Sequence, residues 1–360
     1  MSLRAFAASL ILLVSYTAKA SSEGLSSNTL ANYPIAGLSR PCCTFGIDVL
    51  GAVVGVSGVV DKTNLGSHSF ARDNGVKDSV GLLYTCSAGF VDVSHLRDNA
   101  DWSAHVYFNL RSWLGSGKTI FARNEGGFKS RAVYFPQIDQ AELSTLNDDD
   151  LEKLAVSIGF NLALLHEIPT AFKISVSVPA ATIVYERSSA FSVEDAFSNL
   201  LGNILGAQAA RSPLPYNEAM TLLLKSHLDQ IQAQSVENTY KAYELTRNDW
   251  WVRSFLTSST KVLRREFSFQ GQVEGQLIPN APFCANTEST KLTVPLLLSN
   301  GKSVNDYYEI RGLMNNKLKR NLRRLGLAPK EYLTQSEYPE VIEAIKNLLL
   351  SNLGESILKE

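Results

Sequence analysis

The chain has 360 residues, of which 45% are hydrophobic and 19% are charged, and this composition is typical of a globular protein with a sizeable core. The formal net charge of -1 argues against a general nucleic-acid-binding role, which would need a basic surface. After the first twenty residues, no segment reaches the ~18 uncharged apolar residues of a membrane-spanning helix, so no transmembrane helix is expected in the mature chain.

The first twenty residues have the pattern of a secretory signal peptide. Arg4 supplies a short positive start, residues 5–14 form an apolar run, and Ala-Lys-Ala at residues 18–20 fits a cleavage site. We therefore expect an exported protein, periplasmic or secreted, whose mature chain starts near Ser21. An uncleaved anchor is the alternative, although the apolar run is short for a bilayer.

The mature sequence shows no repeat and no clear linker. Residues 21–40 are rich in Ser, Asn and Gly and predict a loose lead-in. Residues 41–330 predict the main globular domain, and residues 331–360 predict a C-terminal helix packed on it. The expected fold class is α+β, rich in helices, with a smaller β portion in the N-terminal half.

In the N-terminal half, the pattern predicts β structure followed by one long helix. Residues 44–60 and 81–93 are apolar with β-branched residues and favour strands. A helix is predicted from Ser94, its expected cap, to about Trp113. Residues 115–119 resemble the end of a phosphate loop, but they follow a helix and lack the first glycine, so they predict a turn.

Helices dominate the rest of the prediction. Apolar residues recur at helical spacing over residues 151–168, and Pro169 is expected to end that helix. Ser192, with Asp195 three residues later as an approximate capping box, is expected to open the next one. The other predicted elements are a polar loop at 62–77, a hairpin of residues 119–123 and 131–135, an extended segment at 174–185, helices at 192–210, 216–234 and 236–246, a strand at 262–269 and a final helix at 338–353.

Four cysteines follow the signal segment, namely Cys42, Cys43, Cys86 and Cys284. Export makes disulfides permissible, and adjacent cysteines rarely bond to each other because a disulfide needs well-separated Cα atoms. Cys42 and Cys43 should then seek different partners, and Cys86 and Cys284 are available. Free buried thiols are the alternative, and the lack of a Cys-x-x-Cys spacing disfavours a zinc cluster.

The candidate site residues lie in three segments that combine histidine with carboxylates, at residues 81–105, 164–172 and 189–202. The predicted catalytic residues are His95, Asp98, His166, Glu167 and Glu194. The predicted metal ligands are His95, His166 and Glu194, and the cofactor would be a divalent metal such as zinc, which activates water. Asn199 is expected to face the same cleft.

Each segment also has a structural interpretation. His95 and Asp98 are helical neighbours that would cap and order the first turn of their helix. His166 would be a satisfied core histidine. Glu194 and Asp195 would be favoured at a helix start by the helix dipole alone.

The remaining polar features receive simpler interpretations. Asp101 and His105 are expected to be neighbours on one helix face. His68 and His227 stand alone in the sequence and predict surface or packing residues. The basic run at 317–324 predicts a solvated helix face, with peripheral contact to an anionic envelope lipid as the alternative.

Several motifs occur together in one span of roughly residues 38–280. They are Arg-Pro-Cys-Cys-Thr-Phe-Gly at 40–46, the run at 81–102, Leu-His-Glu-Ile at 165–168, the run at 189–202, Tyr-Asn-Glu-Ala-Met at 216–220 and Leu-Arg-Arg at 263–265. In this combination the chain resembles a bacterial exported family catalogued as Domain of Unknown Function family 4056. The resemblance implies no established activity.

By this resemblance the polar residues carried by the motifs are His95, Arg97, Asp98, Asp101, His166, Glu167, Glu194, Asp195 and Asn199. His105 is not among them. Family members commonly have Trp before the His-Glu-Ile sequence and again after the following Thr, whereas this chain has Leu165 and Ala171 there. A missing aromatic wall would alter a pocket and weaken a family activity.

Two functions are therefore expected as alternatives. The first is an exported hydrolase, metal-dependent in one form, whose His/Asp/Glu centre acts on an envelope or extracellular substrate. The second is a non-catalytic envelope binding or structural protein in which the same segments form a buried polar network. A solvent-filled cleft lined by His95, His166 and Glu194 would favour the enzyme, and a dry network would favour the second function.

Overall fold

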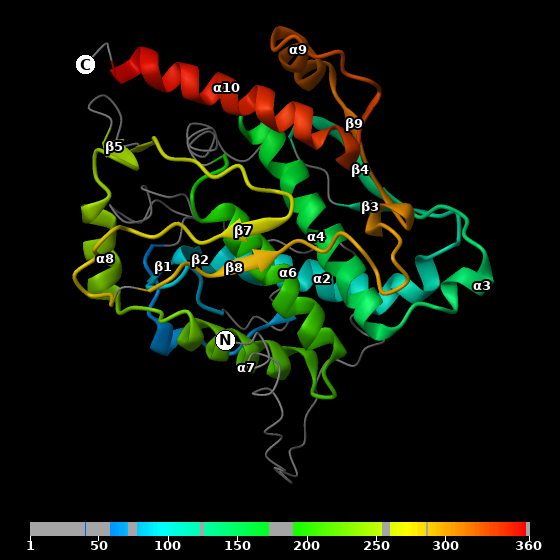
Figure 1. The fold of residues 1–360 in the computed structure, drawn as a ribbon, viewed down its shortest axis with the longest axis horizontal. Coiled ribbons are helices and arrows are strands. Elements are labelled where there is room, and N and C mark those ends of the chain that lie inside the picture. Colours follow the sequence, from blue (N-terminus) through cyan, green and yellow to red (C-terminus); the bar gives the residue numbers. More distant parts are fainter. Residues whose placement is uncertain are drawn as a thin grey trace.

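A computed structural model gives the fold (Figure 1), which is α+β and rich in helices, as predicted. The structure describes residues 40, 58–70, 78–122, 126–172, 190–253, 260–285 and 287–357. The signal segment, Cys42, Cys43, most of the strands predicted at 44–60 and the extended segment predicted at 174–185 lie outside the described residues.

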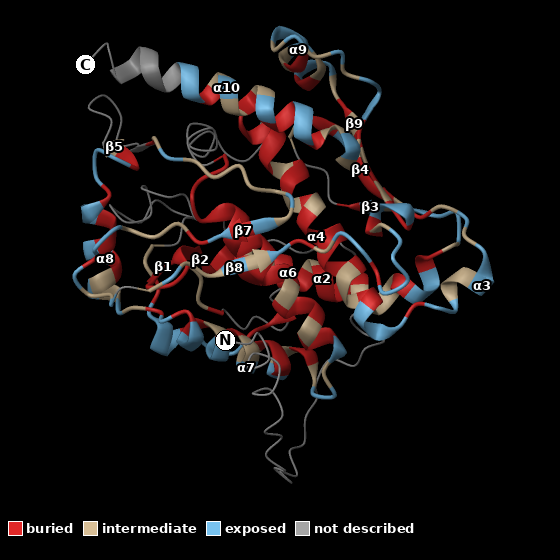
Figure 2. Ribbon diagram, viewed as in Figure 1, coloured by how far each residue is buried: buried red, intermediate tan, exposed pale blue. Residues whose placement is uncertain are grey.

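Long helices form the centre of the molecule. In chain order the helices are α2 (Val93–Trp113), α3 (Gln140–Leu143), α4 (Asp148–Thr170), α6 (Asp195–Arg211), α7 (Tyr216–Gln230), α8 (Val236–Leu245), α9 (Asn316–Arg324) and α10 (Tyr338–Ile357). Helix α2 has its most extensive contact with α6, and α4 packs against both. Figure 2 shows that α2 and α6 are largely buried, whereas α8 and α9 carry many exposed residues.

Small antiparallel sheets flank the helices. The largest that the described residues form has the order β10-β9-β4-β3, with bounds Tyr332–Leu333, Glu309–Met314, Phe128–Tyr134 and Thr119–Ala122. The other pairs are β1 (Leu82–Thr85) with β2 (Gly89–Asp92), β5 (Trp251–Arg253) with β6 (Thr260–Val262), and β7 (Gln272–Glu274) with β8 (Lys291–Thr293). The predicted β3-β4 hairpin forms, but β9 and β10 join it from the C-terminal part of the chain.

Small residues allow α2 and α6 to approach each other closely. A Cβ atom at Gly202 or Gly206 would lie 2.2 Å or less from a carbonyl oxygen of α2, so a larger residue would force the helices apart. Across the same interface the Nδ2 of Asn99 donates a hydrogen bond to the Oδ1 of Asn199 at 2.7 Å. Asn199 therefore packs against α2, and this contact holds the N-terminal ends of α2 and α6 side by side.

Several helix boundaries differ from the prediction, and three of them have a clear local cause. Helix α2 is capped by Asp92 rather than Ser94, because Oδ1 of Asp92 accepts hydrogen bonds from the first backbone N–H groups. Pro169 lies inside the last turn of α4, where the missing N–H removes only one helical hydrogen bond. Helix α6 starts at Asp195, three residues later than predicted, because the N–H of Ser192 bonds to the Asp195 carboxylate in a turn.

The strand predicted at 262–269 is wrong over most of its length. Pairing ends at Val262, and Arg265 makes only an isolated bridge to Ser192. Cys86 and Cys284 form a disulfide with each other, so the expectation that they are available as partners of Cys42 and Cys43 is wrong. Within the described part of the chain, no helix is long and apolar enough to cross a membrane.

Candidate functional site

The polar residues of the three segments gather into two clusters around the N-terminal half of α2. The His95 cluster consists of Asp92, His95, Glu167, Glu194 and Asp195. The Arg40 network consists of Arg40, His68, Asp78, Arg97, Asp98, Asp101 and Tyr216. The first cluster lies where the N-terminal ends of α2 and α6 approach the C-terminal end of α4.

The imidazole of His95 is held between two carboxylates. Its Nδ1 lies 2.8 Å from Oδ2 of Asp92 and 3.4 Å from Oδ1 of Asp195. The negative charge of Asp92 beside Nδ1 favours a proton on that nitrogen and leaves Nε2 as the basic atom of the ring. The Asp92 side chain is fully buried and the His95 side chain is 16% exposed, so the cluster reaches the surface through the ring.

Ser192 joins the two acidic residues at the start of α6. Its Oγ lies 2.7 Å from Oε1 of Glu194 and 3.0 Å from Oδ2 of Asp195. A hydroxyl has one hydrogen to donate, so both contacts are satisfied together only when one carboxyl group is protonated and donates to Oγ. Oε2 of Glu194 is buried and has no hydrogen-bond partner among the described residues.

The environment of these carboxyl groups favours their protonated forms. Burial, reinforced by the charge of Asp92, raises the pKa of Glu194 to about 7. Burial also raises the pKa of Asp195 well above its usual value, and the charges of Glu167 and Glu194 add to that effect. The cluster therefore holds protons that it can exchange close to neutral pH.

Glu167 connects the end of α4 to the turn before α6. Its Oε2 accepts a hydrogen bond of 2.9 Å from the N–H of Phe191. Phe191 has a φ of 56°, a left-handed conformation that is strained for a bulky residue and that recurs near functional sites. The guanidinium of Arg265 donates to the carbonyl of Ala190 and ties a third segment to the same turn.

His166 lies next to Glu167 on α4 but projects from a different side of the helix. Successive residues of an α-helix are about 100° apart, and it is Glu167 that faces the turn before α6. His166 is half-buried, and its carbonyl accepts a hydrogen bond from Oγ1 of Thr170. The joint action of His166 with His95 and Glu194 stays a prediction.

The Arg40 network surrounds the carboxylate of Asp101. Oδ1 of Asp101 accepts hydrogen bonds from Nε2 of His68 at 2.7 Å and from the hydroxyl of Tyr216 at 2.9 Å. Oδ2 of Asp101 accepts one from Arg40 at 2.8 Å. Burial alone would raise the pKa of Asp101, but the charge of Arg40 and the contact with His68 outweigh it and lower this pKa to about 2. Asp101 is therefore an ionised, fully paired residue.

His68, predicted as a surface or packing residue, is buried, and its ring also bonds to Asp101 and lies against Arg97. A guanidinium can only donate hydrogen bonds, so Nδ1 of His68, 3.2 Å from Arg97, is an acceptor and the ring proton is on Nε2. Burial lowers the pKa of His68, which agrees with a neutral ring. The Asp78 carboxylate accepts hydrogen bonds from both Arg40 and Arg97.

Asp98, predicted as a catalytic residue together with His95, lies outside the His95 cluster. Asp98 accepts hydrogen bonds from the backbone N–H and the guanidinium of Arg40, at 2.7 and 2.9 Å, so the structure places it in the Arg40 network. The cap of α2 is Asp92, so the interpretation in which His95 and Asp98 cap this helix is wrong. Asp101 and His105 share one face of α2, as predicted. Asp101 also bonds to His68, and the His105 ring lies against the ring of Trp113.

Histidine nitrogens and carboxylate oxygens are ligands that zinc accepts, and the His95 cluster offers both. Among the residues that the structure describes, however, no group of three or more His, Cys, Asp or Glu side chains is placed to hold a metal ion. The predicted ligands His95, His166 and Glu194 therefore stay a prediction.

Asp92, Arg40, Asp78 and Tyr216 were not among the predicted site residues, although Arg40 and Tyr216 begin the motifs at 40–46 and 216–220. One of these had a local signal, since Asp92 ends a predicted strand just before a helix, where aspartate is a favoured cap. Arg40, Asp78 and Tyr216 meet Asp101 from segments that are far apart in the chain, and no local pattern predicts such a meeting.

Fold and site together define a helix-rich α+β protein with a buried acid-rich cluster at converging helix ends. The family model described as "Protein of unknown function (DUF4056)" matches residues 31–279, so the chain belongs to this family. The matched span contains both clusters. A search of curated proteins and a search of solved structures each found no match.

Proposed function

We propose that the chain is a hydrolase in which His95 is the general base and the surrounding carboxyl groups control its protonation. The observation that carries the proposal is the contact of Nδ1 of His95 with Asp92 and Asp195, beside a buried Glu194 whose pKa is about 7. Such a set of groups with displaced pKa values around one imidazole is typical of acid–base catalysis.

In this mechanism Nε2 of His95 removes a proton from water as the water oxygen attacks an acyl, phosphoryl or glycosyl centre. The carboxylate of Asp92, 2.8 Å from Nδ1, stabilises the imidazolium that forms, and the carboxyl group of Asp195 lies 3.4 Å from the same nitrogen. The imidazolium then gives its Nε2 proton to the leaving oxygen, which returns His95 to its starting state. If the signal segment directs export, the substrate is an envelope or extracellular molecule.

The charge balance supports catalysis over a purely structural role. In the Arg40 network, Asp78, Asp98 and Asp101 each accept a hydrogen bond from the Arg40 guanidinium. The His95 cluster instead collects four carboxyl groups around one histidine, and two of them have raised pKa values. Burying like charges together costs stability, and such a cost is expected where function requires it.

One form of the proposal is metal-dependent, with His95, His166 and Glu194 as ligands of a divalent metal such as zinc. Its support is Oε2 of Glu194, which is buried and without a hydrogen-bond partner among the described residues. A metal there would lower the pKa of a bound water molecule. Elemental analysis of protein purified without chelators or a metal-affinity column tests this form, because a folded and active but metal-free protein would contradict it.

The test of the hydrolase is a comparison of two histidine variants on esters, phosphate esters, glycosides and envelope polymers. His95→Gln should lower kcat/KM by about 10²–10⁴-fold while the protein remains folded, as expected for loss of a general base. His227→Gln is the matched control, because His227 lies on α7 and contacts a backbone carbonyl of its own helix. Equal activity of the two variants would contradict the proposal.

A non-catalytic envelope protein is the second candidate, and the near-complete burial of the carboxyl groups favours it. Glu194 is fully buried and Asp195 is 3% exposed, so these two carboxyl groups have almost no contact with solvent. In that case the cluster would serve stability, and Glu194→Gln and His166→Ala would both lower the free energy of unfolding at every pH. Urea unfolding of the two variants measures this directly.

A further inference from the structure

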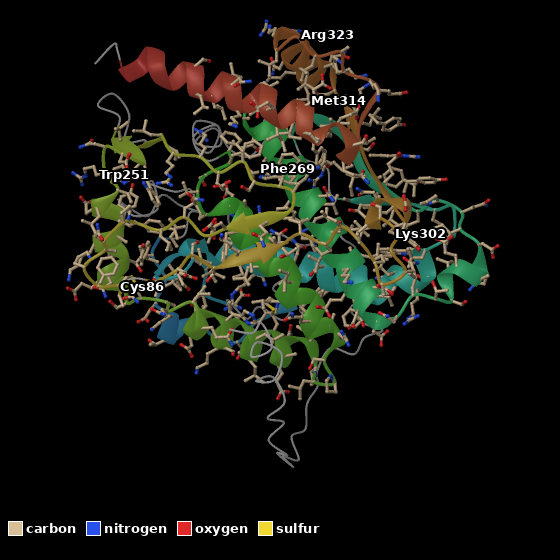
Figure 3. All side chains as sticks on the ribbon, viewed as in Figure 1. Cys86, Trp251, Phe269, Lys302, Met314 and Arg323 are labelled. Carbon is tan, nitrogen blue, oxygen red and sulfur yellow. A yellow bond between two sulfur atoms is a disulfide. The ribbon has the colours of Figure 1, made fainter. Side chains whose placement is uncertain are left out.

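Helix α9 is strongly basic on one side. Its five cationic residues form what we call the α9 cationic face: Lys317, Lys319, Arg320, Arg323 and Arg324. Leu318 and Leu322 are buried and lie one turn apart, so together they attach the helix to the core. At about 100° per residue, four of the cations point away from these leucines and are exposed, whereas Lys319 lies at the edge and is half-buried. Figure 3 shows Arg323 at the periphery of the molecule.

The cations of this face differ from those on the other helices. On those helices, exposed basic residues pair with carboxylates: Arg111 with Asp148, Arg211 with Asp149, Lys225 with Asp229, Lys241 with Glu237 and Lys346 with Glu343. Helix α9 contains no acidic residue, and its five cations form no ion pair with any described residue. A chain with a net charge of -1 thus concentrates unneutralised positive charge at one place.

The surroundings of α9 leave this charge largely intact. Two carboxylates on neighbouring elements are already neutralised, since Glu337 pairs with Lys330 and Glu309 pairs with Arg311. Glu331, which precedes β10, and Glu340 on α10 are carboxylates that form no ion pair with a described residue. On β10, Tyr332 is 40% exposed and pairs with the end of β9, from which α9 starts.

We infer that the α9 cationic face docks on the surface of an anionic phospholipid bilayer. The five charges spread over a helix of nine residues, ~14 Å long at 1.5 Å per residue, and such a spread suits many distributed phosphates better than one bound phosphate. Tyr332, an exposed tyrosine on the strand that pairs with the end of β9, suits the boundary between headgroups and acyl chains. This inference is independent of the proposed hydrolase activity.

The test is sedimentation of the purified protein with vesicles of phosphatidylcholine alone or with 30% phosphatidylglycerol, at low and high salt. The test variant is Arg320→Gln/Arg323→Gln/Arg324→Gln. The control is Lys225→Gln/Lys241→Gln/Lys346→Gln, which removes the same charge from paired, exposed positions. The wild type and both variants have the same N-terminus, so any contribution of the first twenty residues to vesicle binding is equal in all three proteins.

We expect the wild type and the control to bind the anionic vesicles at low salt and to dissociate from them at high salt. Neither protein should bind the neutral vesicles. Each membrane-facing cation contributes about fivefold to the affinity, so the test variant should bind roughly 100-fold more weakly. Equal loss in both triple variants, or equal binding to both vesicle types, would overturn the inference. Binding of the wild type to soluble polyphosphate but not to anionic vesicles would also overturn it and indicate a soluble polyanion.

Discussion

Oδ1 of Asp101 accepts a hydrogen bond from Nε2 of His68 at 2.7 Å, although the two residues are 33 positions apart in the chain. This contact fixes the tautomer of His68, and it joins the segment before β1 to the middle of α2. The same carboxylate pairs with Arg40, so one side chain organises three separate segments. The Arg40 network therefore stabilises the region on which the His95 cluster is built.

Replacement of Asp101 should be strongly destabilising. Asp101→Asn leaves the buried Arg40 without one of its charged partners, and such a loss typically costs about 3–5 kcal/mol. Asp148→Asn is the control, because its ion pair with Arg111 is exposed and contributes less than about 1 kcal/mol. Urea unfolding at pH 7 compares the two variants, and similar losses would contradict a stabilising Arg40 network.

The contribution of Asp101 should also depend on acid. Its pKa is lowered to about 2 in the folded protein, so its stabilising effect is complete above the unfolded value near 3.8 and is lost as the pH falls through 2. The difference in unfolding free energy between wild type and Asp101→Asn should accordingly shrink between pH 5 and pH 2. A difference that stays constant over this range would show that the charge of Asp101 is not what stabilises the fold.

Glu194 should show the opposite pH dependence. Its pKa rises from 4.5 to about 7 on folding, so the folded protein holds this proton more tightly than the unfolded chain does. Stability is then greatest below about pH 4.5 and falls as the pH rises through 7, by roughly 1–3 kcal/mol. Glu194→Gln should remove this loss, and its unfolding free energy should equal or exceed that of wild type at pH 8.

The control for Glu194 is Glu237→Gln, which changes an exposed carboxylate paired with Lys241. Unfolding free energies at pH 5 and pH 8 distinguish the two proposed roles of the His95 cluster. A Glu194→Gln protein that is less stable than wild type at both pH values would favour the structural network.

The close contact between α2 and α6 makes Gly206 sensitive to any side chain. A Cβ at this position would lie 2.0 Å from the carbonyl oxygen of Ala100, so Gly206→Ala must separate the helices. We expect a loss of about 1–3 kcal/mol despite the higher helix propensity of alanine. Ser226→Ala, on the exposed side of α7, is the control and should change stability by less than about 0.5 kcal/mol. Thermal unfolding of both variants measures the difference.

The disulfide between Cys86 and Cys284 joins residues that are 198 positions apart. Cross-linking so long a loop restricts the unfolded chain, and its loss should cost about 2–5 kcal/mol. The double variant Cys86→Ser/Cys284→Ser should match the wild type under reducing conditions in urea unfolding. If reduction leaves the unfolding midpoint unchanged, the bond does not contribute to stability.

The sequence predicted the positions of the helices more accurately than those of the strands. Apolar spacing over residues 151–168 predicted α4, which spans Asp148–Thr170, because a long amphipathic repeat is a strong local signal. Strands β7, β8 and β10 have only two or three residues each, too few for alternation to stand out. Their pairing depends on partners far along the chain.

For the candidate site, the sequence indicated three segments, and the structure brings His95, Glu167 and Glu194 from them into one cluster. What the sequence did not reveal was the separation of Asp98 from that cluster, because its pairing with Arg40 spans 58 positions. Spacing along one helix determines which residues share a face, but it does not determine which distant side chain meets that face.

The sheet β10-β9-β4-β3 extends the folding unit beyond the region of family similarity. The family match ends at residue 279, whereas β4 pairs with β9 at Glu309–Met314. A fragment cut at the end of the match would leave β4 with one unpaired edge and would remove Cys284 from its disulfide. Exposed strand edges promote aggregation, so recombinant fragments of this protein should include the segment through β9 and β10.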